Sequence, residues 1–189
     1  AAAIALFGQG DYKLTDTLKL VAGLRQEHER RELDDFTTGF VLYPSNPARV
    51  GTTTFPAADR ALSTNETSGK LALEYQLAPA SLWYASVGRG VKSGGFTAYN
   101  STNAHQVDAV QPETLIAYEL GFKSDLTPTL RLNGALFLYD YRNQQYQSQV
   151  YIDPVIRNIG RLVNIPKSEI KGLEIELAWT PLAGLKIDQ

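Results

Sequence analysis

Apolar and polar side chains alternate with a period of two along most of the chain, which is typical of half-exposed β-strands. In KGLEIELAW, Leu173, Ile175 and Leu177 fall on one face, and Glu174 and Glu176 fall on the other. The same alternation recurs in LKLVAGLRQE, KLALEYQL and TLIAYELGFK. Helical periodicity is nearly absent, so the pattern predicts an all-β chain.

The predicted strands are long. Their expected ranges are 3–12, 18–34, 66–77, 81–93, 113–125, 129–146, 167–180 and a start at 184. Strands of globular proteins usually have about five or six residues, whereas a strand that crosses a bilayer tilted needs about 9–11. The lengths therefore favour strands that span a membrane.

The predicted connections alternate between short and long. Tight turns are expected at 13–17, 78–80, 126–129 and 181–184, and long loops near 35–65, 94–112 and 147–166. A meander with short turns at one end and long loops at the other is the layout of an outer-membrane barrel. Aromatic residues near strand ends fit the girdles of such barrels: Trp83, Tyr84, Phe137, Tyr139, Tyr141 and Trp179.

Charged residues sit at alternate positions inside these strands, where a dry core would make them costly. They include Arg25, Glu27, Lys70, Glu119 and Glu174. A wetted barrel lumen would accommodate them, with Glu174 and Glu176 paired to basic residues such as Lys123 or Arg131. A half-exposed antiparallel sheet of a soluble protein would accommodate them equally well.

Composition narrows the function classes. The chain of 189 residues carries 18 basic and 20 acidic residues, and a net charge of −2 argues against nucleic-acid binding. No cysteine is present, so no disulfide or thiolate site is possible. The chain also lacks methionine and ends in mid-pattern, and we expect it to be a piece of a larger protein.

Four stretches resemble the C-terminal barrel half of TonB-dependent outer-membrane receptors. They are YASVGRGVKSGGF (84–96), QPETLIAYELGFKSDL (111–126), LRLNGALFLYDYRNQQ (130–145) and NIPKSEIKGLEIELAWTPLAGLKID (164–188). Each motif alone is weak, but their order and spacing are those of the family. Residues 1–65 match chiefly at LKLVAGLRQEHE.

The resemblance implies an antiparallel up-and-down meander that forms part of a transmembrane barrel of the 22-stranded type, with a plug domain in the lumen. It implies a protein of the bacterial outer membrane that imports a scarce nutrient, such as a ferric siderophore, haem, cobalamin or a glycan, with energy from the TonB complex. No stretch of this chain resembles the plug or the TonB-contact motif. The resemblance implies a transport protein rather than an enzyme.

Candidate contact residues lie near the expected long loops. GRGVKSGGF lacks the spacing of a phosphate-binding loop, and its glycines fit a strand end that turns into a loop. Arg89 and Lys92 are candidates for binding anionic substrate or lipopolysaccharide, and His105, Tyr146 and Gln147 for touching substrate. No catalytic, metal or cofactor site is expected.

The sequence is also compatible with two other functions. A complete small membrane barrel could serve as an adhesin or anchor, although the interior of such a barrel must be filled by side chains. A soluble β-rich binding module would purify without detergent.

Overall fold

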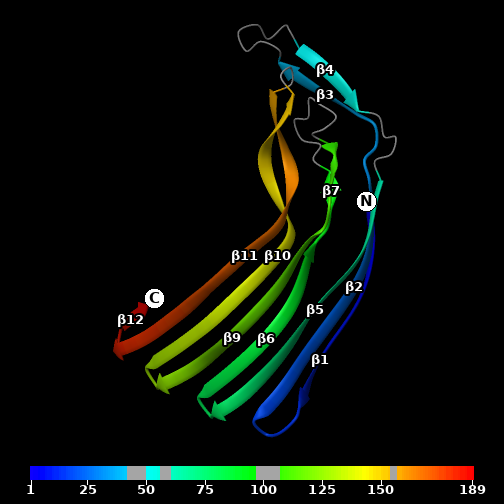
Figure 1. The fold of residues 1–189 in the computed structure, drawn as a ribbon. Helices are drawn as coiled ribbons and strands as arrows, with labels where there is room; N and C mark the ends of the chain where they lie inside the picture. The colour runs from blue at the N-terminus through cyan, green and yellow to red at the C-terminus, as the bar shows by residue number, and fades with distance from the viewer. Residues whose placement is uncertain (42–49, 56–60, 97–106, 154–156) are drawn as a thin grey trace.

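The computed structural model describes residues 1–41, 50–55, 61–96, 107–153 and 157–189. One antiparallel sheet of eight strands contains most of them, in the order β1-β2-β5-β6-β9-β10-β11-β12 (Figure 1). These strands are β1 (Ala2–Lys13), β2 (Leu18–Glu32), β5 (Ala61–Ala78), β6 (Ser81–Lys92), β9 (Glu113–Thr127), β10 (Leu130–Asp153), β11 (Arg157–Leu182) and β12 (Leu185–Asp188). Each strand follows its neighbour along this sheet, which confirms the predicted all-β meander.

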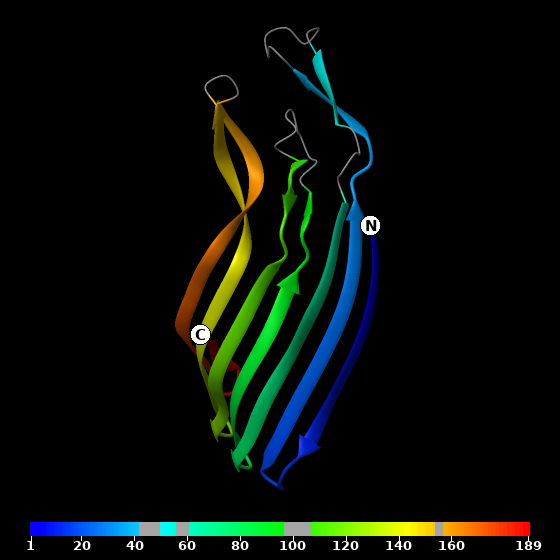
Figure 2. The same cartoon turned by 45° about the vertical axis from the view of Figure 1, so that its right-hand side comes forward.

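Two small pairs of strands lie beyond the main sheet at its loop end. They are β3 (Phe36–Val41) with β4 (Val50–Phe55), and β7 (Gly95–Phe96) with β8 (Ala109–Val110). The main sheet is curved like a section of wall and is not closed, because β1 and β12 each pair along one edge (Figure 2). The part of the chain that the structure describes contains no helix able to cross a membrane.

The strands extend further than the sequence pattern predicts. β5 begins at Ala61, and the pairing of β10 with β11 runs as far as Asp153 and Arg157. Most of the loop expected at 147–166 is therefore a long hairpin. Apolar alternation ends where a strand leaves the apolar region, but backbone pairing continues, because the ladder does not depend on the polarity of the side chains.

The register confirms the two faces that the alternation predicts. Leu120 of β9 lies opposite Ala85 of β6 and Leu136 of β10, and Glu119 lies opposite Ser86 and Phe137. We call the face that carries Leu120 the apolar face and the face that carries Glu119 the polar face. Leu173 and Ile175 of the apolar face are each 63% exposed. This face therefore presents a large apolar surface that suits contact with an apolar environment better than contact with water.

The expected aromatic girdle is only partly correct. Tyr84, Phe137, Tyr139 and Tyr141 share the polar face with Glu119, and two of the six named residues, Trp83 and Trp179, lie on the apolar face. The apolar face near the tight turns also carries Tyr12, Tyr75 and Phe122. Aromatic content near strand ends does not reveal the face, because a one-residue shift reverses it.

Three aromatic rings lie over glycines on the neighbouring strand: Tyr84 over Gly121, Phe122 over Gly134 and Phe137 over Gly172. A Cβ atom at Gly121, Gly134 or Gly172 would stand 2.6 Å from the facing ring. The missing side chain thus leaves room for each ring, and the ring covers backbone that glycine would expose.

We predict that Gly172→Ala destabilises the folded barrel more than Gly90→Ala, by about 1–3 kcal/mol, because the added methyl overlaps the Phe137 ring. A Cβ at Gly90, which lies inside the sheet on the same polar face, meets nothing within 4 Å, which makes Gly90→Ala the matched control. Urea unfolding of the protein refolded in lipid vesicles gives the two free energies of unfolding. Equal losses would show that the ring does not occupy the glycine site.

Candidate functional site at the loop end of the polar face

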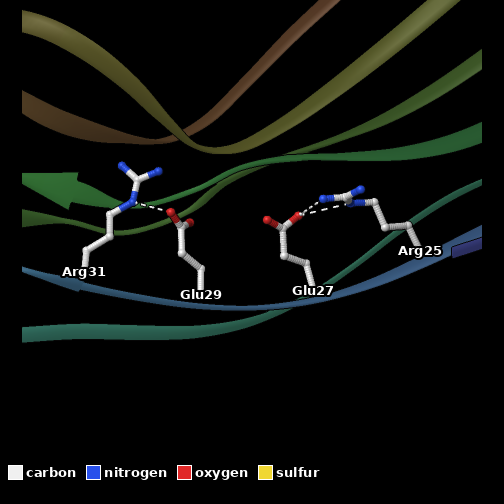
Figure 3. A network of polar contacts seen from close by, with 4 residues as sticks. All are labelled: Arg25, Glu27, Glu29 and Arg31. Atoms are coloured by element: carbon white, nitrogen blue, oxygen red, sulfur yellow. Dashed lines mark hydrogen bonds and ion pairs between the residues drawn. The ribbon is translucent and has the colours of Figure 1, made fainter. Parts of the chain in front are cut away.

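A ladder of charges runs along β2 toward the loop end. Arg25, Glu27, Glu29 and Arg31 occupy every second position and so lie on the polar face. Arg25 Nη2 lies 2.8 Å from Glu27 Oε2, and Arg31 Nε donates to Glu29 Oε1 at 2.7 Å (Figure 3). The two pairs stand in the order basic, acidic, acidic, basic, and each carboxylate is neutralised by its outer neighbour.

Glu29 is the buried member of this ladder, with 9% of its surface exposed. Its hydrogen bond with Arg31, followed by one with Ser93, lowers the pKa of the Glu29 carboxyl below its ordinary value. Ser93 follows the end of β6, so this contact joins β2 to the connection between β6 and β9. A buried carboxylate is tolerated because both groups favour its charged form.

We name residues 93–96 and 107–111 the clamped segment, because side chains hold it from two sides. On the β2 and β5 side, a Cβ atom at Gly95 would stand 3.0 Å from Arg31 Nη1, and one at Gly94 would stand 2.8 Å from Leu62 Cδ2. The backbone of the clamped segment therefore packs closely on these two side chains, and glycine is the residue that permits the approach.

On the β10 and β11 side, amide side chains hold the backbone of the clamped segment. Gln145 Nε2 donates to Ser93 O at 2.8 Å. Asn164 both accepts from Gln111 N at 2.8 Å and donates to Gln111 O at 3.0 Å. Arg161 Nη1 lies 2.9 Å from Asp108 Oδ2. The clamped segment thus bridges the two lateral parts of the sheet.

Buried apolar residues accompany these polar contacts along the chain. Val107 is 1% exposed, Val110 is 3% exposed, and Ile159 of β11 is 7% exposed. Val107 and Val110 are the two most buried apolar residues that the structure describes, and Ala72 of the main sheet is 6% exposed. Apolar packing at the loop end thus accompanies the polar contacts.

The contact residues predicted from the sequence do not share one face of the sheet in the structure. Lys92 lies on the polar face at the end of β6 and is exposed, whereas Arg89 lies on the apolar face and its Nη2 is 3.2 Å from Glu66 Oε2. On β10, Gln147 shares a face with Gln145, and Tyr146 lies on the opposite face. His105 falls outside the described residues.

The ion pairs expected for Glu174 and Glu176 differ from those found. Glu176 Oε2 accepts a hydrogen bond from Asn133 Nδ2 at 2.8 Å. Arg131 binds Asp125 instead, because the register of β10 with β9 places those two residues opposite each other. The described residues contain no group of three or more His, Asp or Glu side chains arranged to hold a metal ion.

Sequence reasoning missed the residues that hold the clamped segment, chiefly Glu29, Arg31, Gln145 and Asn164. Glu29 and Arg31 belong to the charge run EHERRELDD, whose composition is typical of a solvated strand extension. Gln145 and Asn164 bond to partners 52 and 53 residues away along the chain. No local pattern signals such contacts.

A family model described as "TonB dependent receptor-like, beta-barrel" matches residues 1–187. The chain therefore belongs to the TonB-dependent receptor barrel family, and its place is the outer membrane of Gram-negative bacteria. The apolar face is the lipid face of such a barrel, the polar face lines its lumen, and the loop end is extracellular.

Solved structures agree with this fold. The ferric yersiniabactin uptake receptor FyuA from Yersinia pestis matches with a TM-score of 0.72 at 20% identity, over 98% of this chain and 25% of that one. The copper transporter OprC matches with a TM-score of 0.73 at 17% identity, over 98% and 28%. The Serratia marcescens hemophore receptor HasR, a double mutant in complex with its hemophore HasA and heme, matches with a TM-score of 0.67 at 20% identity, over 94% and 32%. The chain thus spans about a quarter to a third of these proteins.

We predict that the clamped segment loosens in acid through Glu29. A folded-state pKa below the ordinary value of 4.5 means that the ionised carboxylate stabilises the contact above that value, and that this stabilisation is lost as the pH falls through the lowered pKa. The protection factors of residues 93–96 and 107–111, which correct hydrogen exchange for the pH dependence of the intrinsic rate, should therefore fall below about pH 4.5.

Glu29→Gln should remove this acid transition, and Glu27→Gln, on the same face of β2, should retain it. An unchanged transition in Glu29→Gln would show that another group controls the contact.

Proposed function

We propose that this chain is part of the wall of a receptor that takes up a scarce nutrient, such as a ferric siderophore, in a process that the TonB complex energises. One observation carries the proposal: the polar lumen face continues to the extracellular end, where side chains fix the clamped segment across it. A held surface binds a ligand at a smaller entropic cost than a free loop does.

Family membership supports the receptor role, since this is a family of receptors and transporters rather than enzymes. The names of the structural relatives span a ferric siderophore, copper and heme. They support the uptake of a metal or metal chelate as a class. The ferric siderophore is our choice within that class.

The chain's own residues would act at the mouth of the lumen. Lys92 is exposed on the lumen face and would attract an anionic chelate toward the opening. Gln147 lies on the same face as Gln145, two residues farther along β10, where its amide can donate to or accept from a polar ligand. Arg25 and Glu27 would present a polar surface deeper in the lumen.

The two alternatives receive less support. A complete small barrel needs a closed sheet, and here β1 and β12 stand as open edges. A soluble module would leave Leu173, Ile175 and their neighbours on the apolar face in contact with water.

The proposal is tested in a strain that lacks the gene, grown in iron-limited medium with ferric siderophores or haem, one at a time, as the iron source. We expect the gene to restore growth on at least one source, and only when TonB is present. Growth on every source without the gene, or restored growth without TonB, would contradict the proposed uptake.

We predict that Lys92→Glu raises the half-saturating concentration for uptake of an anionic ferric siderophore about tenfold, because a repulsive charge at the mouth slows association. Radio-iron uptake by whole cells gives this concentration. Lys186→Glu makes the same charge change in β12 near the tight turns and should leave it unaltered. Equal effects of the two variants would show that Lys92 does not attract the siderophore at the mouth of the lumen.

A further inference from the structure

The ladder between β5 and β6 stops before either strand ends. In the part of the chain that the structure describes, these strands pair from their tight turn as far as Gly69 and Arg89. Both continue beyond that point, since β5 pairs with β2 up to Ala61 and β6 pairs with β9 up to Lys92. The extracellular part of the wall therefore consists of two leaves, β1-β2-β5 and β6-β9-β10-β11. We call the boundary between the leaves, beyond Gly69 and Arg89, the seam.

The side chain of Arg89 crosses the seam from one face of the wall to the other. Its register with Gly69 places Arg89 on the apolar face, whereas Glu66 shares the polar face with Ser68. Arg89 Nη2 nevertheless lies 3.2 Å from Glu66 Oε2, and Nη1 donates to the carbonyl oxygen of Thr67. A side chain can pass between two strands only where their ladder is interrupted, so this contact and the register indicate the same break.

Side-chain contacts replace backbone pairing across the seam. The pair of Arg89 with Glu66 is one, and the clamped segment adds another through the hydrogen bond of Ser93 with Glu29. The Arg89 and Glu66 side chains are 37% and 22% exposed, and an ion pair that water reaches contributes little net stability. Water can also satisfy the backbone groups along the seam. The leaves are thus joined by weak contacts that can break and form again.

Glycines flank the point where the ladder stops. Gly88 and Gly90 stand on either side of Arg89 in β6. A Cβ atom at Gly90 would meet nothing within 4 Å, and one at Gly88 would lie at an ordinary contact distance of 3.6 Å from Gly69 O. Close packing therefore does not require either glycine. Each adds backbone freedom, which is what a hinge needs to absorb a change of φ and ψ.

We propose that the seam is a hinge at which the two leaves separate and close, and that the pair of Arg89 with Glu66 stabilises the closed form. The hinge follows from the strand pairing and is independent of what the receptor binds. Its use rests on the proposed function: separation of the leaves widens the mouth of the lumen, so that the ligand enters the open form and is held by the closed one. A contact made in one of two conformations shifts their populations by its own free energy.

Pulsed electron–electron double resonance measures the hinge in the full-length receptor in lipid vesicles, with any cysteine outside this chain replaced by serine. Nitroxide labels on Ser63→Cys of β5 and Lys167→Cys of β11, both exposed, report the separation of the leaves. We expect a main distance and a longer minor one. Arg89→Gln should raise the population of the longer distance about two- to fivefold, which is the effect that loss of an exposed ion pair has on an equilibrium.

A second pair of labels on the same two strands tests whether the movement is confined to the seam. Tyr75→Cys and Ile175→Cys lie at one level of the sheet, joined by continuous pairing through β6, β9 and β10. Their labels should give one distance, which Arg89→Gln leaves unchanged.

Arg30→Gln is the matched charge control, because Arg30 pairs with Glu32 of its own strand and does not cross the seam. It should leave both sets of distances unchanged. Arg89→Glu alone should favour the longer distance, whereas Arg89→Glu combined with Glu66→Arg should restore the populations of the wild type. This exchange distinguishes an ion pair across the seam from a general loss of folding.

A reversible cross-link tests the use of the hinge. In the double variant Glu66→Cys with Arg89→Cys, a short bis-methanethiosulfonate reagent joins the leaves and reductant removes it. The cross-linked receptor should lose most of its uptake of radio-iron as ferric siderophore, and reductant should restore it. The same reagent on Ala72→Cys with Ser86→Cys, which are paired in the ladder below the seam, should leave uptake unchanged.

Three results would overturn the hinge: one distance for the labels at 63 and 167 that Arg89→Gln does not alter, an equal change for the labels at 75 and 175, or an equal effect of Arg30→Gln. Full uptake by the receptor cross-linked across the seam would overturn the widening of the mouth. Failure of uptake in every form, the reduced ones included, would count against the proposed function alone, since the distances do not depend on uptake.

Discussion

Backbone hydrogen bonding inside a bilayer is the constraint on which this structure depends. Lipid offers no partner for an N–H or C=O group, so each strand that crosses it must pair with its neighbours. The long, unbroken ladders of β2 with β5 and of β6 with β9 satisfy that demand. Once pairing is fixed, the two-residue period sends every second side chain to lipid and the others to the lumen. Side-chain chemistry then decides what each face does.

At the extracellular end the constraint relaxes, because water can satisfy the backbone. The chain there leaves the regular sheet and is held by side chains instead. Glu29 and Arg31 hold the clamped segment from β2, and Gln145 and Asn164 hold it from β10 and β11. The two most buried apolar residues that the structure describes, Val107 and Val110, lie in this region. The side-chain contacts are thus concentrated at the end of the wall where the proposed ligand would bind.

The sequence predicts the fold class, the two faces of the sheet and the tight turns well, since all three follow from local alternation and turn residues. It predicts the upper parts of β10 and β11 poorly, because polar strands above a membrane lose the apolar alternation while they keep their ladder. It separates Arg89 from Lys92 only once the register is known, since the two residues are three positions apart and therefore face opposite sides. The contacts of Gln145 and Asn164 depend on pairing over more than 50 residues, which one sequence cannot reveal.

The central claim is that neighbouring residues of β9 face lipid and lumen in turn. This chain contains no cysteine, so single-cysteine variants at Ile116, Tyr118 and Leu120, and at Ala117, Glu119 and Lys123, can each carry a bimane label in lipid vesicles. Quenching by lipids with a doxyl group in the acyl chain measures contact with the membrane. We expect strong quenching in the first set and little in the second. Equal quenching along the strand, or the reverse alternation, would contradict the account.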